Sequence, residues 1–410
     1  MNAGKSELPD RLFWLATEDE IKSAQTTDIY FQYTIDVLAK KRIAPEVIMQ
    51  VYARTLPYHD NWGVVTGIYE VAKLLEGLPI DVKAMEEGEI FQCASESVIY
   101  EPVLEIRGRY PSFARYENPI LGLLATSSSV STKSARIKSL IGDKVAFSFG
   151  SRRAHPALAP TIERAAYIGG LDKVSNILAA RMLGKKPIGT MPHALIQVFG
   201  DPKKAWRAFD ESLNKEVPRI ALIDTFSDEK QEAISVLDLL GKNLDGVRLD
   251  TPKSRKGDWR RIIEEVRWEM DIRGGKNVKI YVSGGLDEEE VQNVVDVADG
   301  FGVGTCISSP PVIDFSAKIV EFPGSKNPYR AKRGDISGSK QVYRKKGTFQ
   351  DKVTLARSPP PKGYKPLLTD IIRKGKIVRK FEAVDEIRQR VIASVRSLRA
   401  NKPSISWNIP

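Results

Sequence analysis

The sequence predicts an α/β protein: an irregular (β/α) barrel plus an α+β sandwich domain that N- and C-terminal segments build together. Three observations lead to this fold class. The chain has 410 residues, too many for one ordinary compact core, so two or three domains are expected. Short apolar runs alternate with helical segments after Gly142. Before Gly142, and again from about Ser316 onward, strands and helices follow one another without this rhythm.

The composition is that of a globular protein, with 42% hydrophobic and 28% charged residues. No apolar run reaches the roughly 18 residues that a transmembrane helix needs, and the N-terminus lacks the apolar core of a signal peptide. We therefore expect a cytoplasmic protein with no membrane partner. The two cysteines, Cys93 and Cys306, lie far apart without a CxxC motif, which excludes a disulfide framework and a cysteine zinc site.

Positive charge is in excess, because Lys and Arg outnumber Asp and Glu by 11. A basic balance favours anionic partners, either nucleic acid or small phosphorylated metabolites. The cations are densest from Lys326 to Pro410. For many of them, a solvated surface with no ligand is the plain structural alternative.

Residues 1–118 are predicted to form the N-terminal segment of the sandwich. After an irregular start, a helix opens behind Asp28, a plausible N-cap, and its apolar residues follow helical spacing. His59 has a weak context and is interpreted as structural. The next elements are predicted strands over 47–54 and 101–108, a helix over 62–76 and a long helix over 119–141.

Residues 119–315 are predicted to form the barrel. Regular alternation of strands and helices implies parallel strands with right-handed crossovers, and the absence of a visible strand-order reversal favours a complete or slightly open barrel. An open doubly wound sheet is the alternative. The strand-like runs are VAFSFG (145–150), KPIGT (186–190), RIALIDTF (219–226), GVRLD (246–250), VKIYVSGG (278–285) and DGFGVGT (299–305). The helices are expected over 157–167, 171–183, 201–213, 228–241, 257–273 and 287–297.

Residues 316–410 form a basic C-terminal segment that is expected to fold back on the N-terminal domain. Strands are predicted over 317–322, 341–344, 353–356 and 376–381, and a basic amphipathic helix over 383–399 is expected to close the chain.

Polar residues follow the barrel strands, where the chemistry of this fold lies. Ser283, Gly284 and Gly285 end one strand, and Gly304 and Thr305 end the next. Glycine lets an anion approach the backbone closely, and barrel phosphate sites commonly use the loops after the last strands. We therefore expect a phosphate site here, although tight turns alone also require glycine.

Two carboxylates, Asp224 and Asp250, stand at the ends of neighbouring strands. They could hold ribose hydroxyls, bind Mg²⁺ or stabilise a cationic sugar, whereas helix capping is the structural alternative. Arg248 lies two residues before Asp250, so strand alternation points both side chains to one face.

Two of the three histidines, His155 and His193, also follow predicted strands, which favours acid–base or nucleophilic roles over purely structural ones. Arg152 and Arg153 offer planar forks for a carboxylate or a phosphate, and one of them is expected to be exposed structure.

Ten short stretches between about residue 25 and residue 345 are specific when their order and spacing are taken together. They are TDIYFQ (27–32), EPVLEIRGRY (101–110), STKSARI (131–137), FGSRRAHP (149–156), PIGTMPH (187–193), IDTF (223–226), GVRLDTP (246–252), VSGGLDEEEV (282–291), GFGVGT (300–305) and KRGDISGSKQVYR (332–344). In this order they resemble the nicotinate phosphoribosyltransferase family, especially its short archaeal-type branch, among the type II phosphoribosyltransferases.

The resemblance implies transfer of a phosphoribosyl group from phosphoribosyl pyrophosphate to nicotinate, coupled to ATP hydrolysis, in NAD biosynthesis. It also implies a homodimer with a shared active site, and leaves further assembly open. Tyr30 would come from the partner subunit and stack on the pyridine ring opposite Phe149. Arg152 would contact phosphoribosyl or carboxylate groups, and His193 matches the histidine that ATP phosphorylates in relatives.

The remaining site residues follow the same resemblance. Asp224, Arg248 and Asp250 would line the ribose and base pocket, the loops at Gly284, Gly285, Gly304 and Thr305 would bind the 5-phosphate, and His155 would have a branch-specific role. Mg²⁺ and cationic side chains would stabilise the pyrophosphate that leaves.

One departure from the family is that some short members carry a C-terminal cysteine zinc knuckle. The corresponding stretch here reads YRKKGTFQDK and has no cysteine, so no zinc is predicted. Two alternatives remain open within the enzyme class, a nicotinamide-specific or a quinolinate-specific relative. A basic nucleic-acid-binding protein is a remote alternative. Such a protein would have aromatic side chains among its cations, on which bases stack, but only Tyr329 and Tyr343 lie among the cations of residues 326–346.

Overall fold

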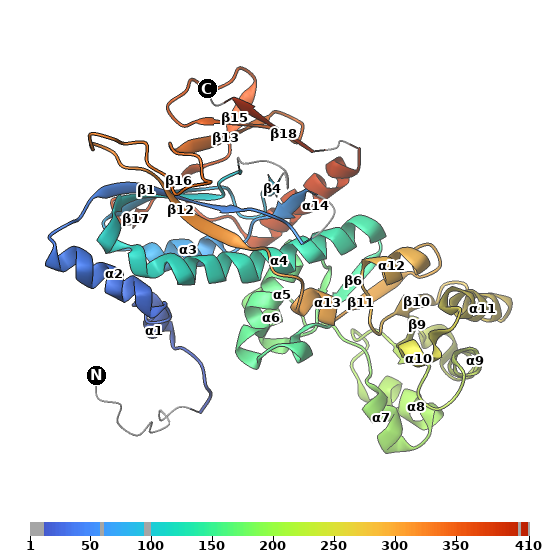
Figure 1. Ribbon diagram of the computed structural model, residues 1–410. Coiled ribbons are helices and arrows are strands. Elements are labelled where there is room, and N and C mark those ends of the chain that lie inside the picture. Colours follow the sequence, from blue (N-terminus) through green and yellow to red (C-terminus); the bar gives the residue numbers. More distant parts are fainter. Residues whose placement is uncertain (1–11, 58–60, 94–99, 401–402, 409–410) are drawn as a thin grey trace.

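The computed structural model describes residues 12–57, 61–93, 100–400 and 403–408. His59 and the first eleven residues lie outside the described residues, and so do the predictions made for them. The described chain has an antiparallel part and a parallel part, joined by one long helix, α4 (Glu117–Ile141) (Figure 1).

Strands from both ends of the chain share one six-stranded antiparallel sheet, which confirms that N- and C-terminal segments build the sandwich together. Helices α3 (Ile68–Leu75) and α4 cover its apolar face, where Val47, Val82 and Ile106 are fully buried. The strand order is β12 (Phe315–Glu321), β1 (Glu46–Ala53), β5 (Leu104–Arg109), β3 (Ile80–Ala84), β16 (Thr369–Arg373) and β17 (Lys376–Ile377). The domain boundaries at residues 118 and 315 stay predictions.

Two short helices precede this sheet. Helix α1 (Glu18–Lys22) begins with a capping box between Thr17 and Glu20. Helix α2 (Ile29–Lys40) begins after Asp28 as predicted, although the Asp28 side chain makes no capping hydrogen bond.

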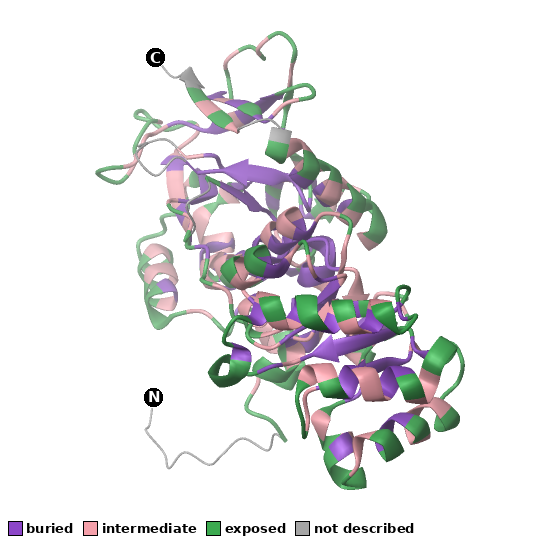
Figure 2. Cartoon of the chain, turned by 90° about the vertical axis from the view of Figure 1, so that its right-hand side faces the viewer, coloured by how far each residue is buried: buried purple, intermediate pink, exposed green. Residues whose placement is uncertain are grey.

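The second sheet is parallel throughout and carries the barrel fold predicted for the central segment. Its order is β7 (Lys173–Val174), β6 (Val145–Ser148), β11 (Gly300–Val303), β10 (Lys279–Val282), β9 (Gly246–Leu249) and β8 (Ile220–Leu222). No described strand pairs β7 with β8, so the barrel is partial and open on that side. Figure 2 shows its strands buried while the covering helices expose their outer faces.

Six helices of this part overlap the predicted ones: α5 (Ala159–Ile168), α6 (Ile177–Met182), α8 (Pro202–Ser212), α9 (Glu229–Leu240), α11 (Trp259–Ile272) and α12 (Glu288–Val294). Three further helices were not predicted, and they are the short α7 (His193–Phe199), α10 (Lys253–Lys256) and α13 (Thr305–Ser308). Short 3-10 turns are η1 (Tyr110–Ser112), η2 (Ala114–Tyr116), η3 (Ser151–Arg153), η4 (Pro156–Leu158) and η5 (Gly241–Asn243).

Two predictions in the barrel were wrong. The run at 186–190 is a loop without strand pairing, and the strand lies instead at β7, inside the segment predicted as helix 171–183. The strand has only two residues, so it shows no alternation of apolar and polar positions. Asn176 then caps α6 by accepting the Ala179 backbone N–H at 3.0 Å, which delays the start of the helix.

The helix predicted over 62–76 was wrong in its first part. Residues Trp62–Val64 form β2, which pairs with β4 (Ile90–Gln92). Gly67 has φ +90°, a left-handed conformation that separates this strand from α3.

The C-terminal segment adds a small four-stranded sheet in the order β15 (Tyr364–Pro366), β13 (Lys340–Lys345), β14 (Gln350–Leu355) and β18 (Ser404–Asn408). Helix α14 (Val384–Ala400) packs on α4 and α5. The helix does not close the chain, because β18 follows it, and the strand predicted over 376–381 is two residues long. No described helix is long and apolar enough to cross a membrane.

A buried ion cluster ties the small sheet to the N-terminal segment. The Arg344 guanidinium contacts Glu89 at 2.6 Å and Asp351 at 2.5 Å, and all three side chains are at most 8% exposed. Because removing the cation leaves two buried carboxylates uncompensated, Arg344→Met is expected to lower the free energy of unfolding by about 3–5 kcal/mol. Urea unfolding measures this loss. The exposed neighbour Lys345→Met is the control, and an equal effect in both variants would contradict the role of the cluster.

Candidate active site

The carboxyl ends of the parallel strands surround a cavity of about 590 Å³. This is the position at which barrel enzymes carry their chemistry. The cavity is lined by Phe149, Ser151, Arg152, Arg153, Ser175, Gly189, Thr190, Met191, Pro192, His193, Ala194, Arg248, Asp250, Ser283, Gly284, Gly285, Gly302, Gly304 and Thr305. Ten of the thirteen predicted site residues are therefore together, and the other three are Tyr30, His155 and Asp224.

His193 stands at the first position of α7, beside both predicted carboxylates. Its Nε2 lies 3.7 Å from Asp224 Oδ1 and 3.7 Å from Asp250 Oδ2. Its Nδ1 lies 3.0 Å from Thr225 Oγ1, which fixes the orientation of the ring. The side chain is 36% exposed, so the imidazole is held by the protein and still accessible from the cavity.

Asp224 does not line the cavity, but it lies against two residues that do, His193 and Asp250. Its side chain is 3% exposed and accepts the Asp250 backbone N–H at 2.8 Å through Oδ2, while Oδ1 has no hydrogen-bond partner among the described residues. Burial raises the pKa of this carboxyl to about 6. A buried oxygen that lacks a partner is suited to receiving a proton or a cation.

Arg248 connects Asp250 to the neighbouring strand end. Its guanidinium lies 3.5 Å from Asp250 Oδ2, as the alternation predicted, and donates to Ser283 Oγ at 3.1 Å. The Ser283 hydroxyl in turn donates to Asp250 Oδ1 at 2.8 Å. Burial opposes ionisation of Asp250, but His193, Arg248 and Ser283 together hold its pKa below the ordinary value. Asp250 is therefore a fixed negative charge at the cavity wall.

The glycine loops pack closely against neighbouring side chains, whereas the predicted phosphate site stays a prediction. Gly284 and Gly285 have φ +90° and +69°, and a Cβ on Gly284 would lie 3.0 Å from Asp250 Oδ1. A Cβ on Gly302 would lie 2.4 Å from the Phe149 ring, so only glycine lets that ring lie against the strand. Gly284 and Gly302 are therefore positions at which a side chain would collide with its neighbours, and both line the cavity.

Arg152 and Arg153 both line the cavity from the 3-10 turn η3. His155 does not join them. Its Nδ1 accepts the Ala157 backbone N–H at 3.2 Å, which caps η4, and its ring meets Phe13 edge-on at a centroid distance of 6.4 Å. Tyr30 lies on α2, next to Phe31, and is 53% exposed. No site role for His155 or Tyr30 follows from a single chain.

Two residues near the cavity were missed by sequence reasoning. Ser175 lines it after β7, the two-residue strand that gives no periodic signal. Lys256 lies behind the glycine loop, where its Nζ donates to the Gly284 carbonyl at 2.9 Å and pairs with Glu290 at 3.3 Å. The position of Lys256 soon after the strand that precedes Asp250 could have indicated that it lies near the site, but nothing in the sequence indicated its contact with Gly284.

The pKa of His193 offers a direct test of this geometry. The Asp250 carboxylate raises the pKa of the imidazole above its ordinary value, partial burial opposes the increase, and Asp224 adds to it. Wild-type His193 is therefore expected to titrate above about 6.5, and Asp250→Asn is expected to lower its pKa. NMR titration of the three histidines, assigned with His193→Ala, measures this shift. An unchanged pKa in Asp250→Asn would show that the two side chains do not interact.

Comparisons with known proteins identify the class. The N-terminal domain of quinolinate phosphoribosyl transferase matches residues 28–128, and its C-terminal domain matches residues 130–318. The chain belongs to this family, the type II phosphoribosyltransferases.

Individual relatives match this chain over nearly its whole length. A crystal structure of nicotinate-nucleotide pyrophosphorylase from Pyrococcus furiosus is 49% identical, with a TM-score of 0.90 over 95% of this chain and 99% of that one. A nicotinate phosphoribosyltransferase of Mycobacterium tuberculosis is 26% identical over 91% of this chain and 88% of its own length. The human nicotinic acid phosphoribosyltransferase, 19% identical with a TM-score of 0.71, covers 93% of this chain and 97% of its own and shares the fold.

Proposed function

We propose that the chain is a nicotinate phosphoribosyltransferase, which forms nicotinate mononucleotide and pyrophosphate from nicotinate and phosphoribosyl pyrophosphate. The pyridine nitrogen attacks C1 of the ribose, the new C–N bond forms, and the C–O bond to pyrophosphate breaks with its electron pair. The observation that carries the proposal is the cavity itself. It combines open glycine loops, paired carboxylates and a held histidine on a chain whose curated relatives are named for this reaction.

The cavity lining has few cations that are not already engaged within the protein, and this favours nicotinate over quinolinate as the base. Arg248 is engaged by Asp250 and Ser283, which leaves Arg152 and Arg153 as the lining cations without a hydrogen bond to described residues. Two exposed arginines that also face an anionic co-substrate fit one base carboxylate better than the two of quinolinate.

The carboxylates fit the charge that develops during transfer. Asp250 is ionised and lies in the cavity wall, where it can stabilise the cationic ribose. The unpartnered Oδ1 of Asp224 and the carboxylate of Asp250 are oxygen ligands of the kind that Mg²⁺ prefers. Mg²⁺ held there would neutralise charge on pyrophosphate. The ring of Phe149 offers one face for the base.

ATP coupling is proposed to run through His193. In the neutral form of the imidazole, with Nδ1 at Thr225, Nε2 is the nitrogen that would attack the γ-phosphorus of ATP. The N–P bond forms, the P–O bond breaks, and ADP leaves; water later hydrolyses the phosphohistidine to phosphate. The accessible imidazole beside two carboxylates supports this role.

Completion of the site is proposed to need a second copy of the chain. The outer face of α2 exposes Ile29 (53%), Tyr30 (53%), Tyr33 (61%) and Val37 (58%), which is an apolar surface suited to an interface. Tyr30 from a partner would then cover the base opposite Phe149. We further propose that the enzyme acts in the cytoplasm, in NAD biosynthesis.

The proposal is tested by initial rates with phosphoribosyl pyrophosphate, Mg²⁺ and each of nicotinate, nicotinamide and quinolinate, with and without ATP. Mononucleotide is expected from nicotinate alone, at a rate that ATP increases. Mononucleotide from quinolinate with release of carbon dioxide would instead assign the quinolinate activity. Product from no base would reject the phosphoribosyl transfer.

A further inference from the structure

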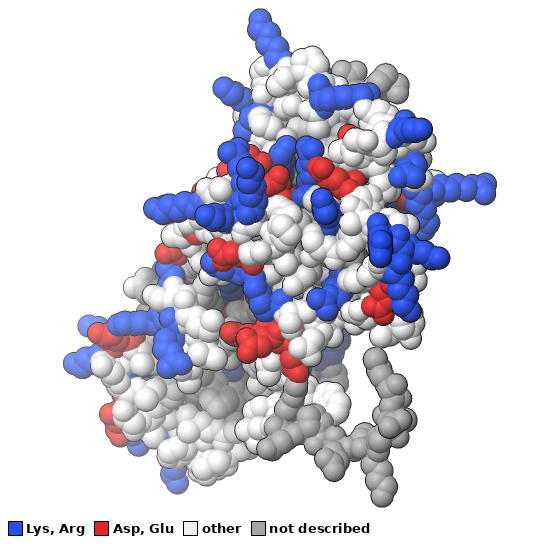
Figure 3. Space-filling model, turned by 90° about the vertical axis from the view of Figure 1, so that its left-hand side faces the viewer, with Lys and Arg blue, Asp and Glu red and all other residues white. Residues whose placement is uncertain are grey.

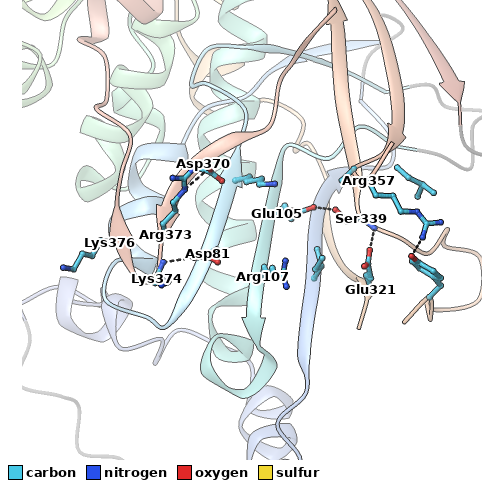
Figure 4. Close-up of a pocket in the computed structure, with 15 residues that line it drawn as sticks. Asp81, Glu105, Arg107, Glu321, Ser339, Arg357, Asp370, Arg373, Lys374 and Lys376 are labelled. Atoms are coloured by element: carbon cyan, nitrogen blue, oxygen red, sulfur yellow. Dashed lines mark hydrogen bonds and ion pairs between the residues drawn. The ribbon is translucent and has the colours of Figure 1, made fainter. Parts of the chain in front are cut away.

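We propose that a second cavity, separate from the barrel, binds a nucleoside polyphosphate. It has a volume of about 690 Å³ and lies on the polar face of the six-stranded antiparallel sheet (Figure 4). None of its lining residues lines the barrel cavity. The volume is in the range of small-molecule sites, which is about 300–1,000 Å³.

The strand pattern explains why this face is charged. Along β3, Ile80, Val82 and Ala84 point to the buried core, so Asp81 and Lys83 point to the opposite face. The sheet register places Arg107 opposite Asp81 and Glu105 opposite Lys83. Charged side chains from several strands therefore gather on one surface of the sheet, on the side opposite the covering helices α3 and α4.

The four carboxylates of the cavity are already engaged within the protein. Asp81 accepts the Lys374 backbone N–H at 2.7 Å, and Asp370 pairs with Arg373 at 2.5 Å. Glu105 accepts the Gln50 side-chain amide at 2.7 Å and the Ser339 hydroxyl at 2.5 Å. Glu321 accepts the Ser339 backbone N–H at 2.9 Å. These acids are thus constrained as structural acceptors.

The cations are not engaged to the same extent. Among the described residues the cavity lining has six cations and four carboxylates. Arg107 pairs with Glu46 outside the lining and Arg373 pairs with Asp370. The amines of Lys83, Lys374 and Lys376 have no hydrogen bond or ion pair with described residues. The surrounding segment strengthens the excess, because residues 316–410 hold 23 Lys and Arg against 7 Asp and Glu. Figure 3 shows cations gathered over the upper part of one face, which holds the antiparallel sheets. An anion is the ligand that this surface attracts.

The two ends of the cavity differ in chemistry. In Figure 4, Arg373, Lys374 and Lys376 lie toward one end and Arg357 toward the other. At the latter end the Arg357 guanidinium covers the 41%-exposed Tyr329 ring, with its carbon 4.8 Å from the ring centroid. The apolar side chain of Leu355 also lines the cavity. An aromatic base can stack at this end while its phosphates meet the amines at the other.

The difference between the aromatic end and the cationic end of the cavity distinguishes among phosphorylated ligands. A free polyphosphate would leave the Tyr329 end unused, and a dinucleotide, with a ring at each end, would bring one ring to the amines. A nucleoside with terminal phosphates matches both ends. The site is independent of the proposed catalytic activity, since it shares no residue with the barrel cavity.

The experiment is calorimetric titration of the full chain with ATP. The test variant is Lys83→Gln/Lys376→Gln, and the control is Lys215→Gln/Lys242→Gln, which removes the same charge from exposed positions of the barrel part. Wild type and control are expected to bind one more ATP per chain than the test variant, or to bind it at least about tenfold more tightly at that site. Equal stoichiometry and affinity in all three proteins would overturn the proposal. Because the readout is a difference, it holds whether or not the barrel cavity also binds ATP.

The nature of the ligand is tested with Tyr329→Ala, tripolyphosphate and NAD. Loss of the ring is expected to weaken ATP binding at this site about tenfold or more and to leave tripolyphosphate binding unchanged. Tripolyphosphate or NAD binding as tightly as ATP would overturn the nucleoside polyphosphate assignment. Equal urea unfolding midpoints of the variants would establish that the sheet itself is intact.

Discussion

Asp250→Ala is expected to lower kcat for mononucleotide formation at least about 100-fold, the scale of a lost electrostatic contact in a transition state. Asp250 is the ionised carboxylate of the cavity wall, and its charge is maintained by His193, Arg248 and Ser283. When pyrophosphate begins to leave, positive charge develops on the ribose, and Asp250 is the carboxylate that the described residues contribute to the cavity lining. The loss should therefore appear in kcat more than in the affinity for nicotinate.

The matched control is Asp201→Ala, which removes a carboxylate that only caps α8 by accepting the Lys203 backbone N–H at 2.8 Å. That variant is expected to lose about 1 kcal/mol of stability and to keep its rate. Because Asp250 also accepts the Ser283 hydroxyl, unfolding of both variants should be compared with wild type. A near-wild-type rate in Asp250→Ala would mean that the carboxylate is a structural acceptor only.

His193→Ala is expected to abolish stimulation by ATP while a basal rate of transfer remains. His193 is the histidine that the described residues contribute to the cavity lining, and its Nε2 lies 3.7 Å from both Asp224 and Asp250. Without the phosphoryl acceptor, ATP should no longer be hydrolysed at this site, and mononucleotide should form only at the basal rate. The ratio of rates with and without ATP, together with phosphate release, measures the effect.

The comparison for this prediction is His155→Ala. The imidazole of His155 is used to cap η4 and does not line the cavity, so the ratio of rates with and without ATP should be kept in that variant. Persistence of the full ATP stimulation in His193→Ala would rule out the phosphohistidine. Loss of stimulation in both variants would point to a general disturbance of the loops after β6 and β7.

The sequence predicted those parts of the fold in which a pattern repeats over several residues. The long helix α4, five of the six parallel strands and the shared antiparallel sheet were all predicted correctly. The failures are short elements. Strand β7 has two residues and β2 has three, so neither could show a period, and their pairing with distant strands decides their conformation.

The site was predictable because the strands are parallel and their carboxyl ends meet at one place. That rule alone brought Asp250, Ser283 and Thr305 together. The rule does not predict how deeply each side chain is buried. Asp224 is 3% exposed and lies outside the cavity lining, whereas Asp250 is 28% exposed and lies in the cavity wall. The rule also does not predict that the His155 side chain caps η4, because this contact depends on the conformation of the turn that follows His155.

The position of the active site can be tested by a crystal structure of the protein with nicotinate mononucleotide. We expect the mononucleotide in the barrel cavity, with its 5-phosphate at the backbone of Gly284–Gly285 and Gly304–Thr305 and its pyridine ring on Phe149. The ribose should lie within reach of Asp250. Mononucleotide bound elsewhere, or with its phosphate turned away from the glycine loops, would contradict the assignment of this cavity as the site of phosphoribosyl transfer.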